Sequence, residues 1–277
     1  MNIKDNFITS INNLLALCYN EVIEIGNGAL VTFTGDQSGY AGLWTGVVSL
    51  AEAVIEPIAI CLVVLYFLMG MMDKLSSENF GIEQAIKELI KLFMGVYLVS
   101  NSLNLIVDLI GLGNGILRRT QGYLLGTVPS LDITVSSLGN LGTVPLIFVS
   151  MLIAIFLFVQ WAIMMLMKAV CVIRLVDIVV RAAMSPIALS DMFSGSFLNS
   201  HAMNFIRSFA AVCLQGALLV IIASFVPAGL NAVLSSGDYS SGWALLGDVA
   251  KAIPITVACF LVMMRSGSIA KEMLGAR

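Results

Sequence analysis

Three carboxylates stand inside long apolar stretches of the sequence, where acidic side chains are costly. Glu52 and Glu56 lie four residues apart, so a helix would place both on one face. Asp108 lies near the end of a second apolar stretch. Ionisable residues within a membrane often mark an ion or substrate route, which makes these three candidates for a polar path or for helix pairing. The alternative is that they lie at the level of the lipid headgroups.

Four more charged residues lie along a later apolar stretch: Lys168, Arg174, Asp177 and Arg181. The last three are spaced i, i+3 and i+7, so one helix face carries them and allows them to pair. Charges cost about 2.5–3.5 kcal/mol each at the centre of a bilayer. We therefore expect 168–200 to be a helical extension at the cytoplasmic face, broken near Pro186 and Gly195. The alternative is that this face lines a polar cavity.

Residue sets for catalysis or metal binding are missing from the sequence. The five cysteines are scattered without a CxxC pair, and His201 is the single histidine, whereas zinc sites draw on several Cys or His ligands. Ser194, Ser196 and His201 contain a nucleophile and a base but lie in a short connection that is typical of a turn. No phosphate-binding glycine motif is present. We expect no enzyme activity, no cofactor and no metal.

Composition sets the class of protein. The chain has 277 residues, of which 59% are hydrophobic and 11% are charged, whereas soluble domains carry roughly 25% charged residues. So few charges cannot cover a water-exposed surface, which excludes a soluble enzyme, a nucleic-acid-binding domain or a disordered chain. The sequence therefore predicts an all-α, polytopic integral membrane protein.

Five apolar stretches are long enough to cross a bilayer. They cover about Val47–Met72, Leu89–Leu112, Leu146–Met167, Phe209–Leu230 and Ile253–Met264. Most offer roughly 20 mainly apolar residues, which suffices for about 30 Å of hydrocarbon, while the last needs its flanking residues. A sixth stretch, Ala169–Leu189, contains the charged residues described above and is not expected to cross.

Basic residues decide the orientation. With five crossings and the N-terminus outside, ten of the fourteen Lys and Arg residues lie inside, as the positive-inside rule requires. This N-out/C-in arrangement gives a transmembrane domain over 46–270, an outer loop over 113–143 and a short cytoplasmic tail over 271–277. Ahead of it, 1–45 forms an amphipathic helix and an extracytoplasmic linker, because apolar residues recur at helical spacing from Ile3 to Ile25.

A further amphipathic helix is predicted over Ser76–Lys91, on the inner side. Its apolar face includes Ile82 and Ile86, and Glu83 to Lys87 is a favourable i,i+4 pair. We expect this helix, together with Lys168–Arg181, to dock cytoplasmic partners.

One local pattern resembles a known family. The charged helix leads into Met184-Ser185-Pro186-Ile187-Ala188-Leu189, and Phe205-Ile206-Arg207-Ser208-Phe209 then opens the next span. With the order of the spans over about 45–270, this is similar to the TrbL-like polytopic inner-membrane subunits of type IV secretion systems, in the form carried by conjugative elements of Gram-positive bacteria. The chain departs from that pattern in having Met-Ser where Gly-Pro is common. Pro186, Phe205 and Arg207 are the family-like positions.

The resemblance implies a non-enzymatic subunit of a secretion channel in the bacterial cytoplasmic membrane. Several copies would assemble, as a homo-oligomeric ring, beside the secretion ATPase and the bitopic assembly subunits. They would help to pass single-stranded DNA with its relaxase, or protein substrates, during conjugation. The residues alone leave two alternatives open: a membrane subunit of a small-solute transporter or ion channel, lined by Glu52, Glu56 and Asp108, and, less favoured, a membrane-embedded enzyme.

Overall fold

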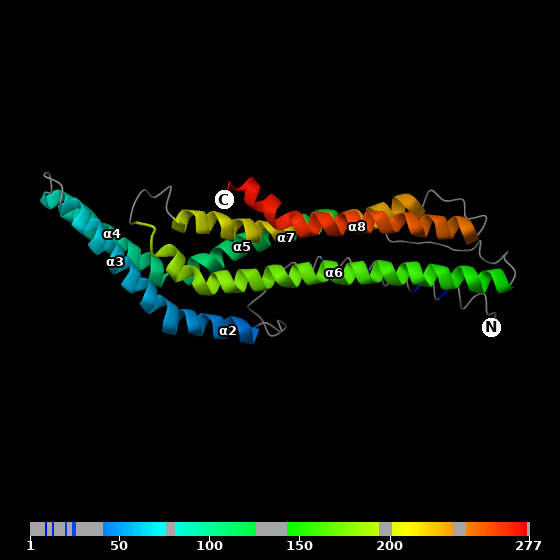
Figure 1. The fold of residues 1–277 in the computed structure, drawn as a ribbon, viewed down its shortest axis with the longest axis horizontal. Helices are drawn as coiled ribbons and strands as arrows, with labels where there is room; N and C mark the ends of the chain where they lie inside the picture. Colours follow the sequence, from blue (N-terminus) through cyan, green and yellow to red (C-terminus); the bar gives the residue numbers. More distant parts are fainter. Residues whose placement is uncertain are drawn as a thin grey trace. The chain divides into compact units, whose positions relative to one another are not determined.

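The computed structural model describes residues 41–75, 81–125, 143–193, 201–234 and 242–275, together with Thr9, Asn13, Asn20, Glu24 and Ile25. Within these ranges every regular element is a helix (Figure 1). The elements are α2 (Ala41–Leu50), the π-helix η1 (Ala51–Ile55), α3 (Glu56–Leu75), α4 (Ile82–Ser100), α5 (Ser102–Leu125), α6 (Thr143–Leu189), α7 (His201–Leu234) and α8 (Gly242–Met273). Most of the predicted helix from Ile3 to Ile25, and all of 194–200, lie outside the described residues.

Four of the described helical stretches are long and apolar enough to cross a membrane: Trp44–Leu75, Ile147–Leu189, His201–Gly229 and Ala250–Met273. The bent pair of α4 and α5 adds a fifth if it forms one span. The prediction of an all-α polytopic membrane protein is therefore confirmed. The spans differ in burial: 67% of the 18-residue apolar window of His201–Gly229 is buried inside the protein, against 17% of that of Trp44–Leu75.

A π-turn joins α2 to α3 just ahead of Pro57. The backbone N–H of Glu56 donates to the carbonyl of Ala51, five residues earlier. Proline lacks an N–H and its ring collides with the carbonyl four residues before it, so a wider turn relieves the clash. The first predicted span, Val47–Met72, is thus helical on both sides of Pro57.

The second predicted span, Leu89–Leu112, is not one straight helix. Its two halves, α4 and α5, meet at Asn101 with a bend of 60°. The Asn101 amide Nδ2 donates to the carbonyl of Tyr97 at 2.9 Å, and the Asn101 backbone N–H donates to the same carbonyl at 3.1 Å. Asparagine side chains compete with the backbone for hydrogen bonds in this way, which ends the helix.

The predicted outer loop 113–143 is helical over its first part, because α5 continues to Leu125. This expectation was wrong for 113–125, while 126–142 lie outside the described residues. One glycine of this part of α5 serves helix packing. A Cβ on Gly113 would lie 2.9 Å from the Cβ of Cys213 in α7, so only glycine allows this close approach.

Pro186 does not break α6, contrary to expectation. The helix runs on to Leu189, so the third span and the charged extension form one helix of 47 residues, about 70 Å long. The carbonyl of Ala182 loses its usual donor because Pro186 has no N–H. The Ser185 hydroxyl donates to that carbonyl at 2.8 Å, which removes the penalty of leaving it unsatisfied.

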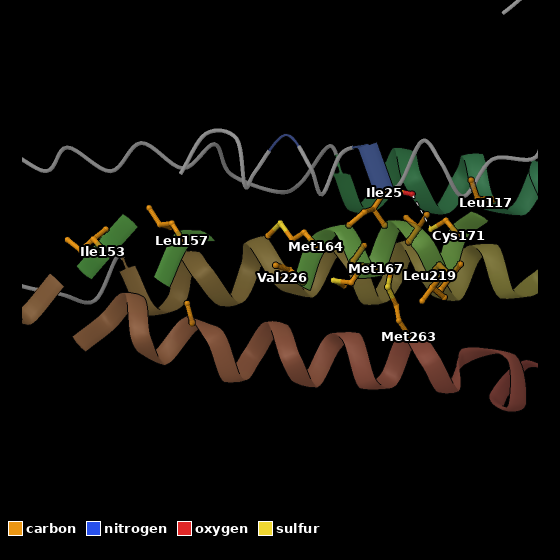
Figure 2. Packing of buried hydrophobic residues seen from close by; sticks show 14 of the residues in the cluster. Ile25, Leu117, Ile153, Leu157, Met164, Met167, Cys171, Leu219, Val226 and Met263 are labelled. Carbon is orange, nitrogen blue, oxygen red and sulfur yellow. Dashed lines mark hydrogen bonds between the residues drawn. The ribbon is translucent and has the colours of Figure 1, made fainter. Parts of the chain in front are cut away.

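The residues group into two compact units. Unit 1 contains Met1–Leu30, Ile116–Ile173 and Gly216–Ser266, and unit 2 contains Val31–Gly115, Arg174–Gln215 and Gly267–Arg277. The core of unit 1 is apolar and rich in methionine, with Met164, Met167 and Met263 fully buried (Figure 2). Within it, Gln160 of α6 donates to the Thr256 hydroxyl of α8, a buried polar link between two spans.

The segment around Glu24 belongs to unit 1. Ile25 is 1% exposed in its core, and the Cys171 thiol donates to the Ile25 carbonyl at 3.8 Å (Figure 2). Lys168 pairs with Glu24. The N-out/C-in orientation stays a prediction.

Substituting Gly113 tests the close approach of α5 and α7. We expect Gly113→Leu to lower the free energy of unfolding by about 1–3 kcal/mol, because the added side chain must displace the Cys213 backbone. Gly111→Leu is the matched control, since a Cβ there meets nothing within 4 Å. Thermal unfolding of the detergent-solubilised protein, followed by circular dichroism, measures both. Equal melting temperatures for the two variants would contradict the packing described here.

Candidate functional site: a charged face of α6 packed on α7

Arg174 is buried inside unit 2, with only 3% of the residue exposed. Its Nε donates to the carbonyl of Val212 at 2.9 Å, and its Nη2 donates to the carbonyl of Cys213 at 3.1 Å. Both acceptors are backbone groups in the middle of α7, and a helical carbonyl has a second lone pair for such a donor. The planar guanidinium therefore fastens α6 to two consecutive residues of α7.

Arg181 and Asp177 form a second link, two turns further along α6. Arg181 Nε donates to Asp177 Oδ1 at 2.7 Å, and its Nη1 donates to the Ser208 hydroxyl of α7 at 2.7 Å. The spacing predicted that Arg174, Asp177 and Arg181 could pair with one another. In the structure Asp177 pairs with Arg181, while the Nε and Nη2 of Arg174 bond to α7.

Apolar packing surrounds these links. Ile178 and Ala182 of α6 are fully buried against Phe209 of α7, in a cluster that also contains Ile106 and Ile110 of α5. The rings of Phe205 and Phe209 stack with their centroids 6.2 Å apart. Pro186, one of the family-like positions, is buried near the end of α6, and Arg207 is half-buried on α7. The low dielectric of such surroundings strengthens the hydrogen bonds of Arg174 and makes their loss costly.

Lys168 belongs to unit 1, where it pairs with Glu24. Within the predicted docking stretch Lys168–Arg181, Arg174 is buried. The docking role of this stretch stays a prediction.

The predicted polar path rests on the three carboxylates of Glu52, Glu56 and Asp108. Among the described residues, no hydrogen bond or ion pair joins Glu52, Glu56 and Asp108 to one another. Glu52 and Asp108 are exposed on η1 and α5, and Glu56 is half-buried at the start of α3. The polar path and the headgroup-level interpretation thus both stay predictions.

One buried carboxylate, that of Glu88, was not identified from the sequence. Glu88 of α4 is 6% exposed and accepts hydrogen bonds from Lys74 of α3 and from Lys91. The signal was its position at the edge of an apolar run, three residues before Lys91, which is an i,i+3 pairing distance. The partner Lys74 could not be found in this way, because the contact depends on how α3 and α4 pack.

The geometry around these charged groups is structural rather than catalytic. In the parts of the chain that the structure describes, the charged side chains of α6 hold helices together, and no group of three or more His, Cys, Asp or Glu is placed to hold a metal ion. His201 is exposed at the start of α7, and Ser194 and Ser196 lie outside the described residues.

Comparison with known families gives the identity. The model of the TrbL/VirB6 plasmid conjugal transfer like proteins matches residues 24–186, more than half of the chain. The chain belongs to this TrbL/VirB6 family. The match includes α2 to α5 and α6 as far as Pro186, and thus the charged residues of α6, whereas Phe205 and Arg207 lie beyond it. No curated protein and no solved structure matches the chain.

Membership of the TrbL/VirB6 family confirms the resemblance seen in the sequence. The chain is a multi-pass membrane component of conjugal transfer by type IV secretion, and its family is a structural subunit rather than a known enzyme family. The membrane-length helices agree with this localisation.

Replacing Arg174 tests its role as the α6–α7 fastener. We expect Arg174→Gln to destabilise the protein by about 1.5–3 kcal/mol, because hydrogen bonds from a charged donor to the carbonyls of Val212 and Cys213 are lost. Arg118→Gln, on the exposed face of α5, is the control. Thermal unfolding in detergent and the amount of protein in isolated membranes report the effect. Wild-type stability of Arg174→Gln would show that the bonds to α7 contribute little.

Proposed function

We propose that the chain is a structural channel subunit of a conjugative type IV secretion system in the bacterial cytoplasmic membrane. The observation that carries the proposal is the family match over residues 24–186, which makes the chain a conjugal transfer component. The finer role, assistance in passing single-stranded DNA with its relaxase or protein substrates, is our inference. The prominence of helix-fastening contacts, with Arg174 and Arg181 engaged on α7, supports a scaffold or conduit.

The assembly we propose has several copies of the chain, forming a ring, with the secretion ATPase and bitopic assembly subunits beside it. Exposed apolar surfaces on α3 and α8 support lateral contacts in the membrane. Only 17% of the 18-residue apolar window of Trp44–Leu75 and 22% of that of Ala250–Met273 is buried inside the chain. For the cytoplasmic partners, α4 is a better docking element than α6. Its Glu83 and Lys87 are exposed beside exposed Ile82 and Ile86, whereas Arg174 is buried.

Crosslinking of DNA in transit tests the proposed role. Donor cells are treated with formaldehyde during mating, the tagged chain is isolated, and co-recovered DNA is quantified. We expect DNA from the transferred region to be enriched over a chromosomal locus, because the strand passes beside this subunit. A donor whose relaxase cannot nick is the control and should show no enrichment.

Failure of the proposed role has an equally clear signature. If transfer to recipients proceeds normally while the recovered DNA equals the chromosomal background, the chain does not contact the strand. The family membership would then stand, and the conduit would have to be assigned to other subunits.

A further inference from the structure

Two lysines and one buried glutamate meet where α3 and α4 pack together in unit 2. Lys74 Nζ donates to Glu88 Oε1, and Lys91 Nζ donates to the same oxygen at 2.9 Å. The Glu88 side chain is 8% exposed, whereas those of Lys74 and Lys91 are 41% and 40% exposed. Two ammonium groups thus share one carboxylate oxygen, and the two lysine side chains are the exposed part of the cluster.

A pocket adjoins this cluster. Glu88 and Lys91 line it together with Tyr66 and Ser190, and the apolar lining residues include Phe67 and Leu92. Glycine keeps the two helices close: a Cβ on Gly95 would lie 2.9 Å from the Val63 side chain. The pocket therefore places the Lys91–Glu88 pair beside an apolar wall.

The cluster lies where charged sequence gives way to apolar sequence on both helices. Neither Pro57–Met72 nor Leu92–Val107 contains an Asp, Glu, Lys or Arg. Large apolar side chains next to the cluster are exposed, among them Met69 and Met72 on α3 and Phe93 and Met94 on α4. In a membrane protein such a boundary lies at the level of the lipid headgroups, with the exposed apolar side chains facing acyl chains.

We propose that the lysines of this cluster, beside the pocket, bind the phosphate group of an anionic phospholipid. Lys91 would bind the phosphate oxygens by charge-assisted hydrogen bonds, with Lys74 adding positive charge. Glu88 positions the two lysines, because both ammonium groups are held on one of its oxygens. Basic pockets between membrane helices bind anionic headgroups in this way, and the exposed apolar side chains provide contacts for the acyl chains.

Native mass spectrometry of the full chain, delipidated in detergent and then mixed with phosphatidylglycerol or phosphatidylcholine, tests the site. We expect retention of phosphatidylglycerol over phosphatidylcholine, and an about fivefold weaker retention in Lys91→Gln, the loss expected for one basic residue at a membrane surface. Lys87→Gln is the matched control, because Lys87 lies on the same helix, pairs with Glu83 and does not line the pocket. It should bind as the wild type does.

Other variants and probes keep the outcome decisive. Lys91→Arg keeps the charge and should retain the anionic lipid, which separates loss of binding from loss of folding. Equal retention of both lipids by the wild type, or equal loss in Lys91→Gln and Lys87→Gln, would overturn the proposal. Displacement of the lipid by millimolar inorganic phosphate would also overturn it, because the site would then recognise free phosphate without need of acyl chains.

Discussion

Polar groups in apolar surroundings need hydrogen-bond partners inside the protein, and this constraint acts in both units of the structure. Arg174 meets it by donating to two carbonyls of α7, and Ser185 meets it by bonding the carbonyl that Pro186 leaves without a donor. The Gln160 amide nitrogen meets it by donating to the Thr256 hydroxyl across two spans, while Gln160 Oε1 is an exception that is buried without a hydrogen-bond partner. Because an unsatisfied polar group costs several kcal/mol in such a medium, these contacts fix which helices pack together and in which register.

This use of charge bears on what the protein does. A permease or pump exposes its intramembrane ionisable groups to a path, whereas Arg174, Asp177 and Arg181 of α6 bond to α7 or to each other. Such an arrangement suits a subunit that holds a large assembly in the membrane, as membership of the TrbL/VirB6 family implies. The exposed faces of α3 and α8 then provide the surface on which lipids or neighbouring subunits pack.

The sequence was sufficient where local pattern decides the structure and insufficient where packing decides it. Apolar length predicted the spans, and the i,i+4 spacing allowed the pairing of Asp177 with Arg181. By contrast, the close approach at Gly113 and the α7 carbonyls that Arg174 binds depend on neighbouring helices. Pro186 misled for a local reason, because the adjacent Ser185 bonds the carbonyl that the proline leaves without a donor.

The most direct test of the account is the transfer frequency of an element from which the gene for this chain has been deleted in frame. The account predicts that donors with the deletion lose conjugative transfer and that the wild-type chain supplied in trans restores it, because the channel cannot assemble without this membrane subunit. Normal mating efficiency of the uncomplemented deletion strain would contradict the central claim that this TrbL/VirB6 protein is part of the transfer machinery.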